Sequence, residues 1–270
     1  HYLVTGGLGG LGLHIARLLL RRFEARLVLL VRRPLDDADP GADSGLARRS
    51  SAEERRLALA ELQRLPGSVE LRFADVGDEL GLREALRELP PFDGAFHLAG
   101  SFPIRTLVEE APESWRATLS PKLAGFDNLD ALLPAEALLV SAGSVYGELG
   151  TVGGGAYAVA NSMLAARAAQ RAERGRPTRH IDWSHWEETG LSRGFAFREQ
   201  AGALGLCMME PRQALHSLLA ALAGPHPVLV VGLDTQAPHL AWRTKGAAEP
   251  AEVLQLDERA PLPSHPLLDP

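Results

Sequence analysis

A run of glycines directly behind the first apolar segment limits this chain to few folds. Thr5–Gly12 reads Thr-Gly-Gly-Leu-Gly-Gly-Leu-Gly and lies between a strand-like segment, Tyr2–Thr5, and a helical pattern that begins at Leu11. Glycine allows positive φ angles and a close approach of the backbone to a ligand, and a helix N-terminus presents free N–H groups to an anion. This order predicts a Rossmann-type loop that binds a dinucleotide pyrophosphate, a turn without a ligand being the alternative. The expected contact residues are Thr5, Gly6, Gly7, Leu8, Gly9, Gly10, Leu11 and Gly12.

Short apolar runs alternate with longer helical patterns along the rest of the chain. Strands are expected at Tyr2–Thr5, Leu27–Val31, Val69–Ala74, Gly94–His97, Ala137–Ser141, His180–Trp183 and Val228–Val231. Helices are expected at Leu11–Phe23, Ala52–Leu65, Leu80–Glu88, Pro112–Leu132, Gly155–Arg174 and Pro211–Ala223. Because the apolar runs are continuous, they are typical of strands buried on both faces of a parallel sheet. The predicted fold class is therefore α/β, a doubly wound parallel sheet of Rossmann type.

The chain is expected to hold one folded domain at residues 1–233 and a linker at 234–270, where periodicity fades and proline becomes frequent. It begins at His1 with a strand-like segment and without an initiator Met, so we interpret it as part of a longer polypeptide. The Gly-, Ala- and Phe-rich segment Leu191–Cys207 has no clean period and is interpreted as a mobile lid.

Composition excludes several classes of function. Hydrophobic residues make up 46% and charged residues 23% of the chain, as in globular proteins with a sizeable core. The net charge of -6 argues against nucleic acid or an anionic membrane as the main partner. No apolar run is long enough to span a bilayer and no signal peptide is visible, so a cytoplasmic location is expected. Cys207 is the only cysteine, which excludes an internal disulfide and a cysteine metal cluster; no metal site is expected.

The end of the second expected strand indicates which dinucleotide the loop prefers. An NAD site usually has Asp or Glu here to hold the ribose 2′-hydroxyl, whereas this chain has Arg32 and Arg33. Two guanidinium groups at this point would bind a 2′-phosphate through charge-assisted hydrogen bonds. The sequence therefore predicts NADPH as cofactor, the alternative being that both arginines are solvated surface residues.

Two further strand ends supply expected cofactor contacts. Asp75 and Val76 follow the third strand, where a carboxylate can accept a hydrogen bond from the adenine amino group; a helix cap is the alternative for Asp75. Ala99 and Gly100 follow the fourth strand, where small residues let the backbone pass beside the cofactor ribose. His97 is interpreted as a packed core residue without a catalytic role.

Hydroxyl groups from two segments are expected to meet at the same edge of the sheet. Tyr157 opens a helix of small residues, and Ser144 lies just beyond the expected end of the fifth strand. Ligands of open α/β sheets bind outside the carboxyl ends of the strands. Reduction of a ketone needs an acid that protonates the developing alkoxide and donors that hold the carbonyl. We therefore predict that Tyr157 is the acid and that Ser144 binds the carbonyl.

A phenol with a pKa near 10 donates poorly at neutral pH. Lys122, on the helix after the fourth strand, is predicted to lie beside Tyr157 and to lower the pKa of the phenol by about 1–3 units. Asn161 lies one helical turn past Tyr157, on the same face of the helix, where it can orient the lysine or a water that supplies protons.

Other residues compete for these roles. Tyr146 has no Lys or Asn one turn further on, so packing or pocket lining is the favoured interpretation, and Ser141 lies deeper in its strand than Ser144. His185 is left without a role. Cys207–Met209 is interpreted either as part of the wall of an acyl channel or as helix packing.

Taken together, these residues resemble the ketoreductase domain of modular or iterative polyketide synthases, a branch of the short-chain dehydrogenase/reductase superfamily. The resemblance runs from Tyr2 to about Val231. Ordinary members of the superfamily have Lys four residues after the Tyr and Asn on the earlier helix. In polyketide ketoreductases these two residues are exchanged. This chain has the exchanged pattern, with Asn161 after the Tyr and Lys122 on the earlier helix. Similar segments are Phe96–Gly100, Tyr157–Asn161, Ile181–Trp186 and Pro211–Leu215.

The resemblance implies NADPH-dependent reduction of a β-ketoacyl thioester carried on the phosphopantetheine arm of an acyl carrier protein. Tyr157 would donate the proton, Ser144 would bind the carbonyl oxygen, and Lys122 with Asn161 would tune Tyr157. Neighbouring synthase domains are implied as partners, among them an N-terminal structural subdomain that pairs with the catalytic half. The end of the chain, Pro263–Leu268, resembles the opening of a dehydratase domain, with a proline-rich linker as the alternative.

The chain departs from the family at the markers of product stereochemistry. Phe102–Ile104 stands where B-type members have Leu-Asp-Asp, and Leu149 stands where A-type members have Trp, so the product configuration stays open. Two other functions are considered. A nucleotide-sugar epimerase or dehydratase needs Lys four residues after the Tyr, where this chain has Asn161. A catalytically silent structural domain would be free to lose the site residues that are intact here.

Overall fold

A seven-stranded parallel sheet organises the chain, and its strand order is β3-β2-β1-β4-β5-β6-β9. The computed structural model describes residues 1–35, 52–187, 189, 192 and 198–240. The strands of this sheet are β1 (Tyr2–Thr5), β2 (Arg26–Val31), β3 (Ser68–Phe73), β4 (Gly94–His97), β5 (Leu138–Ser144), β6 (Thr178–Trp183) and β9 (Val228–Val231). The strand order reverses between β1 and β4, which is the place where ligands bind in such sheets. The predicted doubly wound fold is confirmed.

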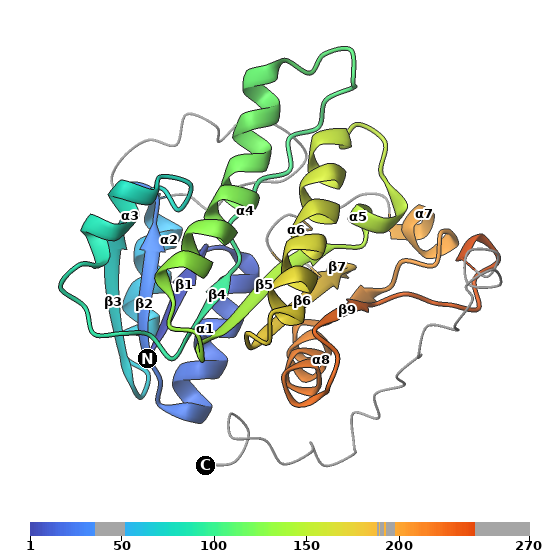
Figure 1. Ribbon diagram of the computed structural model, residues 1–270. Coiled ribbons are helices and arrows are strands. Elements are labelled where there is room, and N and C mark those ends of the chain that lie inside the picture. The colour runs from blue at the N-terminus through green and yellow to red at the C-terminus, as the bar shows by residue number, and fades with distance from the viewer. Residues whose placement is uncertain (36–51, 188, 190–191, 193–197, 241–270) are drawn as a thin grey trace.

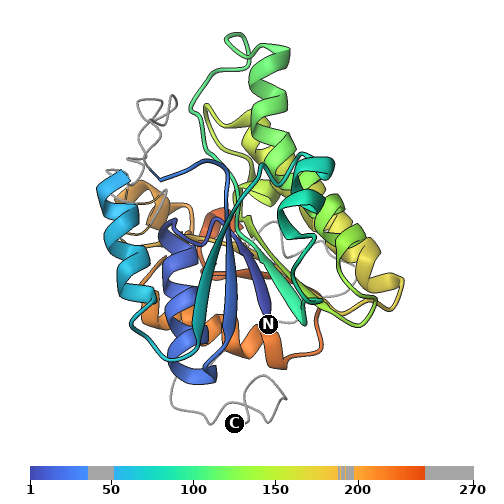
Figure 2. The same cartoon turned by 90° about the vertical axis from the view of Figure 1, so that its left-hand side faces the viewer.

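Helices cover both faces of the sheet, as Figures 1 and 2 show. The helices are α1 (Gly10–Phe23), α2 (Ala52–Leu62), α3 (Glu79–Leu86), α4 (Pro112–Leu132), α5 (Tyr146–Leu149), α6 (Gly155–Glu173), α7 (Arg198–Ala203) and α8 (Pro211–Ala223). A separate pair of short parallel strands, β7 (His185–Trp186) and β8 (Met208–Met209), follows β6. In Figure 2, α4 and α6 lie on one side of the sheet, and α1 and α8 lie on the other.

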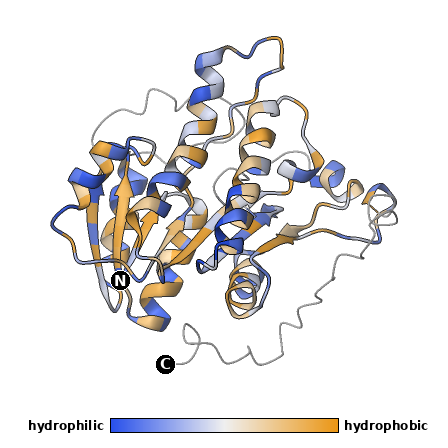
Figure 3. Cartoon of the chain, viewed as in Figure 1, coloured by the Kyte–Doolittle hydropathy of each residue, from blue (hydrophilic) through white to orange (hydrophobic). Residues whose placement is uncertain are grey.

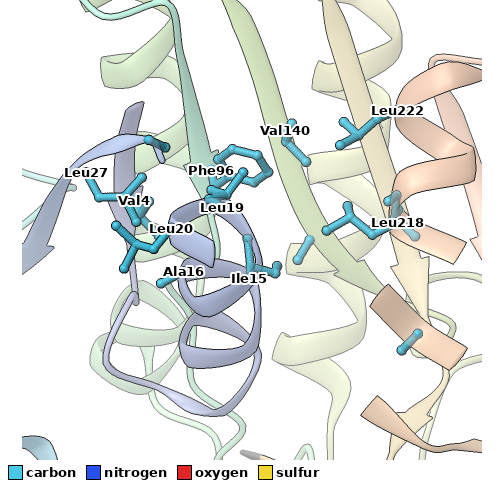
Figure 4. Close-up of a cluster of buried hydrophobic side chains, with 14 of the residues drawn as sticks. Val4, Ile15, Ala16, Leu19, Leu20, Leu27, Phe96, Val140, Leu218 and Leu222 are labelled. Atoms are coloured by element: carbon cyan, nitrogen blue, oxygen red, sulfur yellow. The ribbon is translucent and has the colours of Figure 1, made fainter. Parts of the chain in front are cut away.

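Each face of the sheet has its own hydrophobic core. One core joins α1 and α8 to the sheet; in Figure 4, Ile15 and Leu19 of α1 and Leu218 of α8 are directed toward strand residues such as Val140. The second core joins α3, α4 and α6 to the opposite face, with Phe126 of α4 fully buried in it. The central strands are predominantly hydrophobic in Figure 3, as strands buried on both faces must be.

Most of the expected elements are present within two or three residues, and the differences have local causes. β5 continues to Ser144, which pairs in register with Trp183, so Ser144 ends the strand instead of following it. Part of the expected lid Leu191–Cys207 lies outside the described residues, and Arg198–Ala203 forms α7. The short elements α5, β7 and β8 were not expected, because two to four residues are too few to show a period.

The C-terminal part of the described chain packs onto the loop behind α7. Ala237 and Leu240 are buried, and a Cβ placed at Gly205 would lie 2.7 Å from the Leu240 Cδ1 atom. Residues 234–240, which the sequence assigns to the linker, therefore contact the domain. Residues 241–270 lie outside the described part.

Among the described helices, none is both long and apolar enough to cross a membrane. No group of three or more His, Cys, Asp or Glu side chains suited to a metal ion occurs among the described residues.

Candidate active site

A cavity of about 430 Å³ opens at the carboxyl ends of the strands, next to the point where the strand order reverses. It joins the glycine loop to the expected catalytic residues in one continuous space. Its walls come from β1 and the glycine loop, the ends of β2, β4, β5 and β6, the start of α2, the middle of α4, the start of α6, and β7. All eight loop residues from Thr5 to Gly12 line it.

The glycine loop is shaped so that side chains would not fit. Gly6 has a φ of +68°, and a Cβ there would lie 2.9 Å from the Leu98 carbonyl oxygen. A Cβ at Gly12 would lie 2.2 Å from the Gly6 oxygen. The loop leads directly into α1, whose N-cap residue Gly9 makes no side-chain capping bond. Backbone N–H groups at this helix start suit a pyrophosphate, so these residues fit a dinucleotide.

The predicted pair of arginines is divided in the structure. Both arginines are exposed, but Arg32 lines the cavity and Arg33 does not. Because successive residues leaving a strand point in opposite directions, both side chains of such a pair rarely face the same ligand. Arg55 of α2 lines the cavity as well, and its buried Nε has no hydrogen-bond partner. Sequence reasoning missed Arg55, since it lies within an ordinary charged helix, and its place at the cavity with an unpaired Nε can be found only from the structure.

Asp75 and Val76, for which the sequence predicts contact with the adenine, also line the cavity. Asp75 does not cap α3: the N-cap position is Asp78, and the Asp75 Oδ1 instead accepts a hydrogen bond from the Gly77 N–H at 2.9 Å. The carboxylate is thereby held at the end of β3, at the cavity wall. Ala99 and Gly100 line the cavity on the opposite strand end.

Thr5 and His97 fix the segment that carries Ala99. The Thr5 hydroxyl oxygen accepts hydrogen bonds from the N–H groups of Leu98 and Ala99 at 3.1 and 3.2 Å. His97 is buried, with one ring nitrogen 3.0 Å from the Thr5 hydroxyl and the other 3.0 Å from the Lys122 carbonyl oxygen. Burial lowers the pKa of His97 to about 4, so the ring is neutral and serves packing and hydrogen bonding.

Three of the four expected catalytic residues line the cavity, and the fourth, Asn161, does not. Ser144 ends β5, Tyr157 lies in the first turn of α6, and Lys122 comes from α4; all three line the cavity and are at least nine-tenths buried. The Lys122 Nζ donates a hydrogen bond to the Ala142 carbonyl at 3.0 Å and lies 5.9 Å from the centre of the Tyr157 ring. Asn161 is fully buried one turn further along α6.

Asn161 is held by its own helix. Its Nδ2 donates to the Tyr157 carbonyl oxygen at 2.8 Å, and its buried Oδ1 has no hydrogen-bond partner. The unpaired Oδ1 is a buried acceptor that a water or an ammonium group could satisfy.

The pKa of Tyr157 differs from the expectation. Burial raises it above the ordinary value, and this effect exceeds the opposing hydrogen bonds from Ser144 and Asn161. The expected lowering by Lys122 is thus wrong in its net direction, because removal of the phenol from water disfavours its charged form. Lys122 is affected by the same burial, which lowers its pKa to about 8 despite the attraction of Asp182.

An aromatic side chain that the sequence did not assign to the site, Phe102, packs against Tyr157. The Phe102 ring centre lies 4.6 Å from that of Tyr157 and 6.2 Å from that of Tyr146. The Tyr146 hydroxyl lies 2.9 Å from the Nε2 of His185, and both residues line the cavity. Tyr146 therefore has the pocket-lining place expected of it, and His185 holds its hydroxyl. Cys207 and Met209 pack in the core shared with α1 and α8.

The fold and the site define a Rossmann-type dinucleotide-binding domain whose serine, tyrosine and lysine meet beside the nucleotide cavity, as in short-chain dehydrogenases/reductases. The family model described as "KR domain" matches residues 1–188. The chain belongs to this ketoreductase domain family, whose relatives here are polyketide synthases.

The chain resembles small parts of very large proteins. It is 33% identical to the spectinabilin polyketide synthase system protein NorA′ of Streptomyces orinoci over 256 residues, which cover 92% of this chain and 6% of that protein. It is 32% identical to the pikromycin polyketide synthase component PikAII of Streptomyces venezuelae over 249 residues, which cover 87% of this chain and 6% of that protein.

Solved structures agree with this assignment. A ketoreductase domain from the bacillaene assembly line matches with a TM-score of 0.75 and 26% identity, over 90% of this chain and 57% of that one. The ketoreductase from the first module of phoslactomycin biosynthesis in Streptomyces sp. HK803 matches with a TM-score of 0.73 and 27% identity, over 92% of this chain and 56% of that one. Domains of this kind bind a nicotinamide cofactor, for which the glycine loop is suited.

Proposed function

We propose that this domain reduces a β-ketoacyl thioester to the β-hydroxyacyl thioester with NADPH, while the acyl chain is carried by an acyl carrier protein. The observation that carries the proposal is the convergence of Ser144, Tyr157 and Lys122 at one end of the cavity that the glycine loop opens. A nucleotide-binding domain without chemistry has no need for a buried phenol, hydroxyl and ammonium at that place.

The preference for NADPH rests on two guanidinium groups at the cavity wall. Arg32 and Arg55 both line the cavity and would hold the 2′-phosphate, for which the unpartnered Nε of Arg55 would be one donor. Thr5–Gly12 would hold the pyrophosphate, and Asp75 with Val76 the adenine. When bound, the reduced nicotinamide supplies a hydride to the keto carbon.

The chain's own residues supply the proton and hold the carbonyl. The raised pKa of Tyr157 keeps the phenol protonated at neutral pH, which is the form that a proton donor needs. Ser144 donates a hydrogen bond to the substrate carbonyl oxygen, and the Lys122 ammonium stabilises the phenolate that forms when the proton has left. Asn161 keeps the first turn of α6 in place and offers its Oδ1 to a water that returns a proton.

The partners follow from the same proposal. The substrate arrives on the phosphopantetheine arm of an acyl carrier protein, and neighbouring synthase domains, including an N-terminal structural subdomain, complete the assembly in the cytoplasm. The catalytic unit is residues 1–233 in this scheme, and 234–270 leads toward a following domain.

Oxidation of NADPH in the presence of a small β-ketoacyl thioester tests the proposal. We expect turnover in the unmodified chain and a loss of about 10²–10⁴-fold in kcat in Tyr157→Phe, with NADPH binding retained. Tyr146→Phe is the matched control, since its hydroxyl contacts His185, and should retain most of the activity. Binding of NADPH without any turnover would instead identify a silent structural domain, and conversion of a nucleotide sugar would identify an epimerase or dehydratase.

A further inference from the structure

A row of polar side chains crosses the sheet beneath the candidate active site. Thr5 of β1 pairs in register with His97 of β4, His97 with Ser141 of β5, and Ser141 with His180 of β6. Residues paired in this way project from the same face of a sheet. All four are at most 1% exposed. The row therefore lies under the helices on that face, where Lys122 and Tyr157 are also found.

The row ends in a buried carboxylate. The Ser141 hydroxyl lies 2.8 Å from the Nδ1 of His180, and the Nε2 of His180 lies 3.2 Å from the Oδ1 of Asp182, which is 1% exposed. A carboxylate oxygen accepts hydrogen bonds, so the Nε2–H of His180 is the donor toward Asp182, and the other ring nitrogen shares a hydrogen bond with the Ser141 hydroxyl. Burial of a carboxylate is costly unless it is paired, so a chain of this kind points to a charge partner.

Gly143 leaves room for this carboxylate beside the strand segment that holds the lysine. A Cβ at Gly143 would lie 1.9 Å from the Asp182 Oδ1, so only glycine fits opposite Asp182. The residue before it, Ala142, accepts the hydrogen bond of the Lys122 ammonium. Asp182 is also the group whose charge favours the protonated form of Lys122.

Among the described residues, no other group near the Lys122–Tyr157 pair could be the charge partner of Lys122. The titratable groups whose charges reach the pair or its neighbours are His97 from β4, His180 and Asp182 from β6, and Tyr146 from α5. Asp182 is the only carboxylate among these four residues.

We infer that Asp182, clamped by His180 and Ser141, is a positioning residue that serves as the buried counter-charge of Lys122 and keeps its ammonium in place beside Tyr157. The inference rests on the proposed function for its catalytic meaning, but the pairing of charges does not depend on turnover. Asp182 contacts neither substrate nor cofactor in this scheme; it acts through Lys122.

Titration of Lys122 by NMR tests the pairing directly. The chain has only two lysines, Lys122 and Lys245, so a sample labelled with ¹³Cε-lysine gives two signals, and Lys245→Arg assigns them. We expect the titration midpoint of Lys122 to fall by about 1 unit or more in Asp182→Asn, because an opposite charge has been removed from a low-dielectric site. Asp182→Ser is the second variant, should the amide not fit beside Gly143.

The control is Thr178→Val. Thr178 lies at the other end of β6 and is 2% exposed, and its hydroxyl bonds to Arg171. The substitution Thr178→Val removes a buried hydrogen bond of the same strand and should leave the titration midpoint of Lys122 unchanged. An unchanged midpoint in a folded Asp182 variant, or an equal shift in Thr178→Val, would overturn the inference.

The pH profile of reduction adds the catalytic readout. Asp182 favours the protonated forms of both Lys122 and Tyr157, so its removal should move the alkaline limb of kcat to lower pH. If the midpoint shifts while the unmodified chain shows no reductase activity, the proposed function fails and the charge pairing stands. If the chain is active but neither the Lys122 midpoint nor the alkaline limb of kcat shifts in the Asp182 variant, the charge pairing is wrong and the proposed function stands.

Discussion

Burial of Lys122 makes the stability of the fold depend on pH. The pKa of the amine is lowered from 10.5 to about 8 because burial disfavours the ammonium. Between pH 8 and 10.5 the unfolded chain therefore binds more protons at this residue than the folded chain, and the free energy of unfolding rises with pH. Lys122→Met removes this dependence. We expect the free energy of unfolding of the wild type, relative to that of the variant, to be about 3 kcal/mol higher at pH 10 than at pH 7. Urea unfolding at the two pH values measures this difference. A difference that stays constant with pH would contradict the expectation.

Arg55 is the residue that should decide between NADPH and NADH. Its guanidinium lines the cavity with one nitrogen unpartnered, and a charge-assisted hydrogen bond to a phosphate contributes about 1.5–3 kcal/mol. Arg55→Gln should therefore weaken NADPH binding by about 10–100-fold and leave NADH binding nearly unchanged, as cofactor fluorescence titration would show. Arg56→Gln, an exposed neighbour outside the cavity lining, is the control. Equal losses for both cofactors would assign Arg55 to general support of the fold.

At the scale of elements, a buried arginine joins α4, α6 and β6 at the end of the sheet away from the site. Arg171 is 1% exposed; its Nε donates to the Asp130 Oδ1 at 2.6 Å, and its Nη2 donates to the Ala137 carbonyl at 3.0 Å. Arg171→Leu removes the donor of the buried Ala137 carbonyl, while Asp130 keeps Arg176 as a partner, so we expect a loss of about 1–3 kcal/mol in the free energy of unfolding. Urea denaturation measures it.

Arg167→Ala provides the comparison one turn earlier on α6. Arg167 pairs with Asp127 at the surface, where ion pairs contribute about 0–1 kcal/mol. A loss at Arg171 no larger than the loss at Arg167 would show that the buried network does not hold the elements together. Neither substitution should change the KM of the folded enzyme, because neither residue lines the cavity.

The helices and strands also differ in how well the sequence predicts them. Periodicity located every strand of the main sheet and the six longer helices, because those strands are buried on both faces and those helices are long enough to show a pattern. The glycine loop and the positions of Ser144, Tyr157 and Lys122 were recognisable from chain order alone. Arg55, the division of Arg32 from Arg33, and the Ser141–His180–Asp182 chain were not, since each depends on how separate elements meet in space.

At the scale of the whole molecule, the strand order explains why one cavity can serve both nucleotide and chemistry. β1 lies between β2 and β4, so the glycine loop after β1 has the Arg32 strand end on one side and the Ala99 segment on the other. β5 then brings Ser144 to the same edge, and α4 and α6 cover it with Lys122 and Tyr157. Residues distant in sequence meet because parallel strands all end at one edge of the sheet.

The C-terminal boundary of the folded unit is the last feature that can be tested. Leu240 is 3% exposed and Ala237 8% exposed, and the Asp234 N–H donates to the Gly205 carbonyl at 2.8 Å. Removal of residues 234–270 exposes the apolar surface that these side chains cover, which should cost about 2–4 kcal/mol and lower Tm by several degrees. Removal of 241–270 alone is the matched comparison and should give a higher Tm than the longer truncation, because it keeps Ala237 and Leu240. Equal Tm values for the two truncations would place the boundary at residue 233, because the contacts of Leu240 would then contribute nothing to stability.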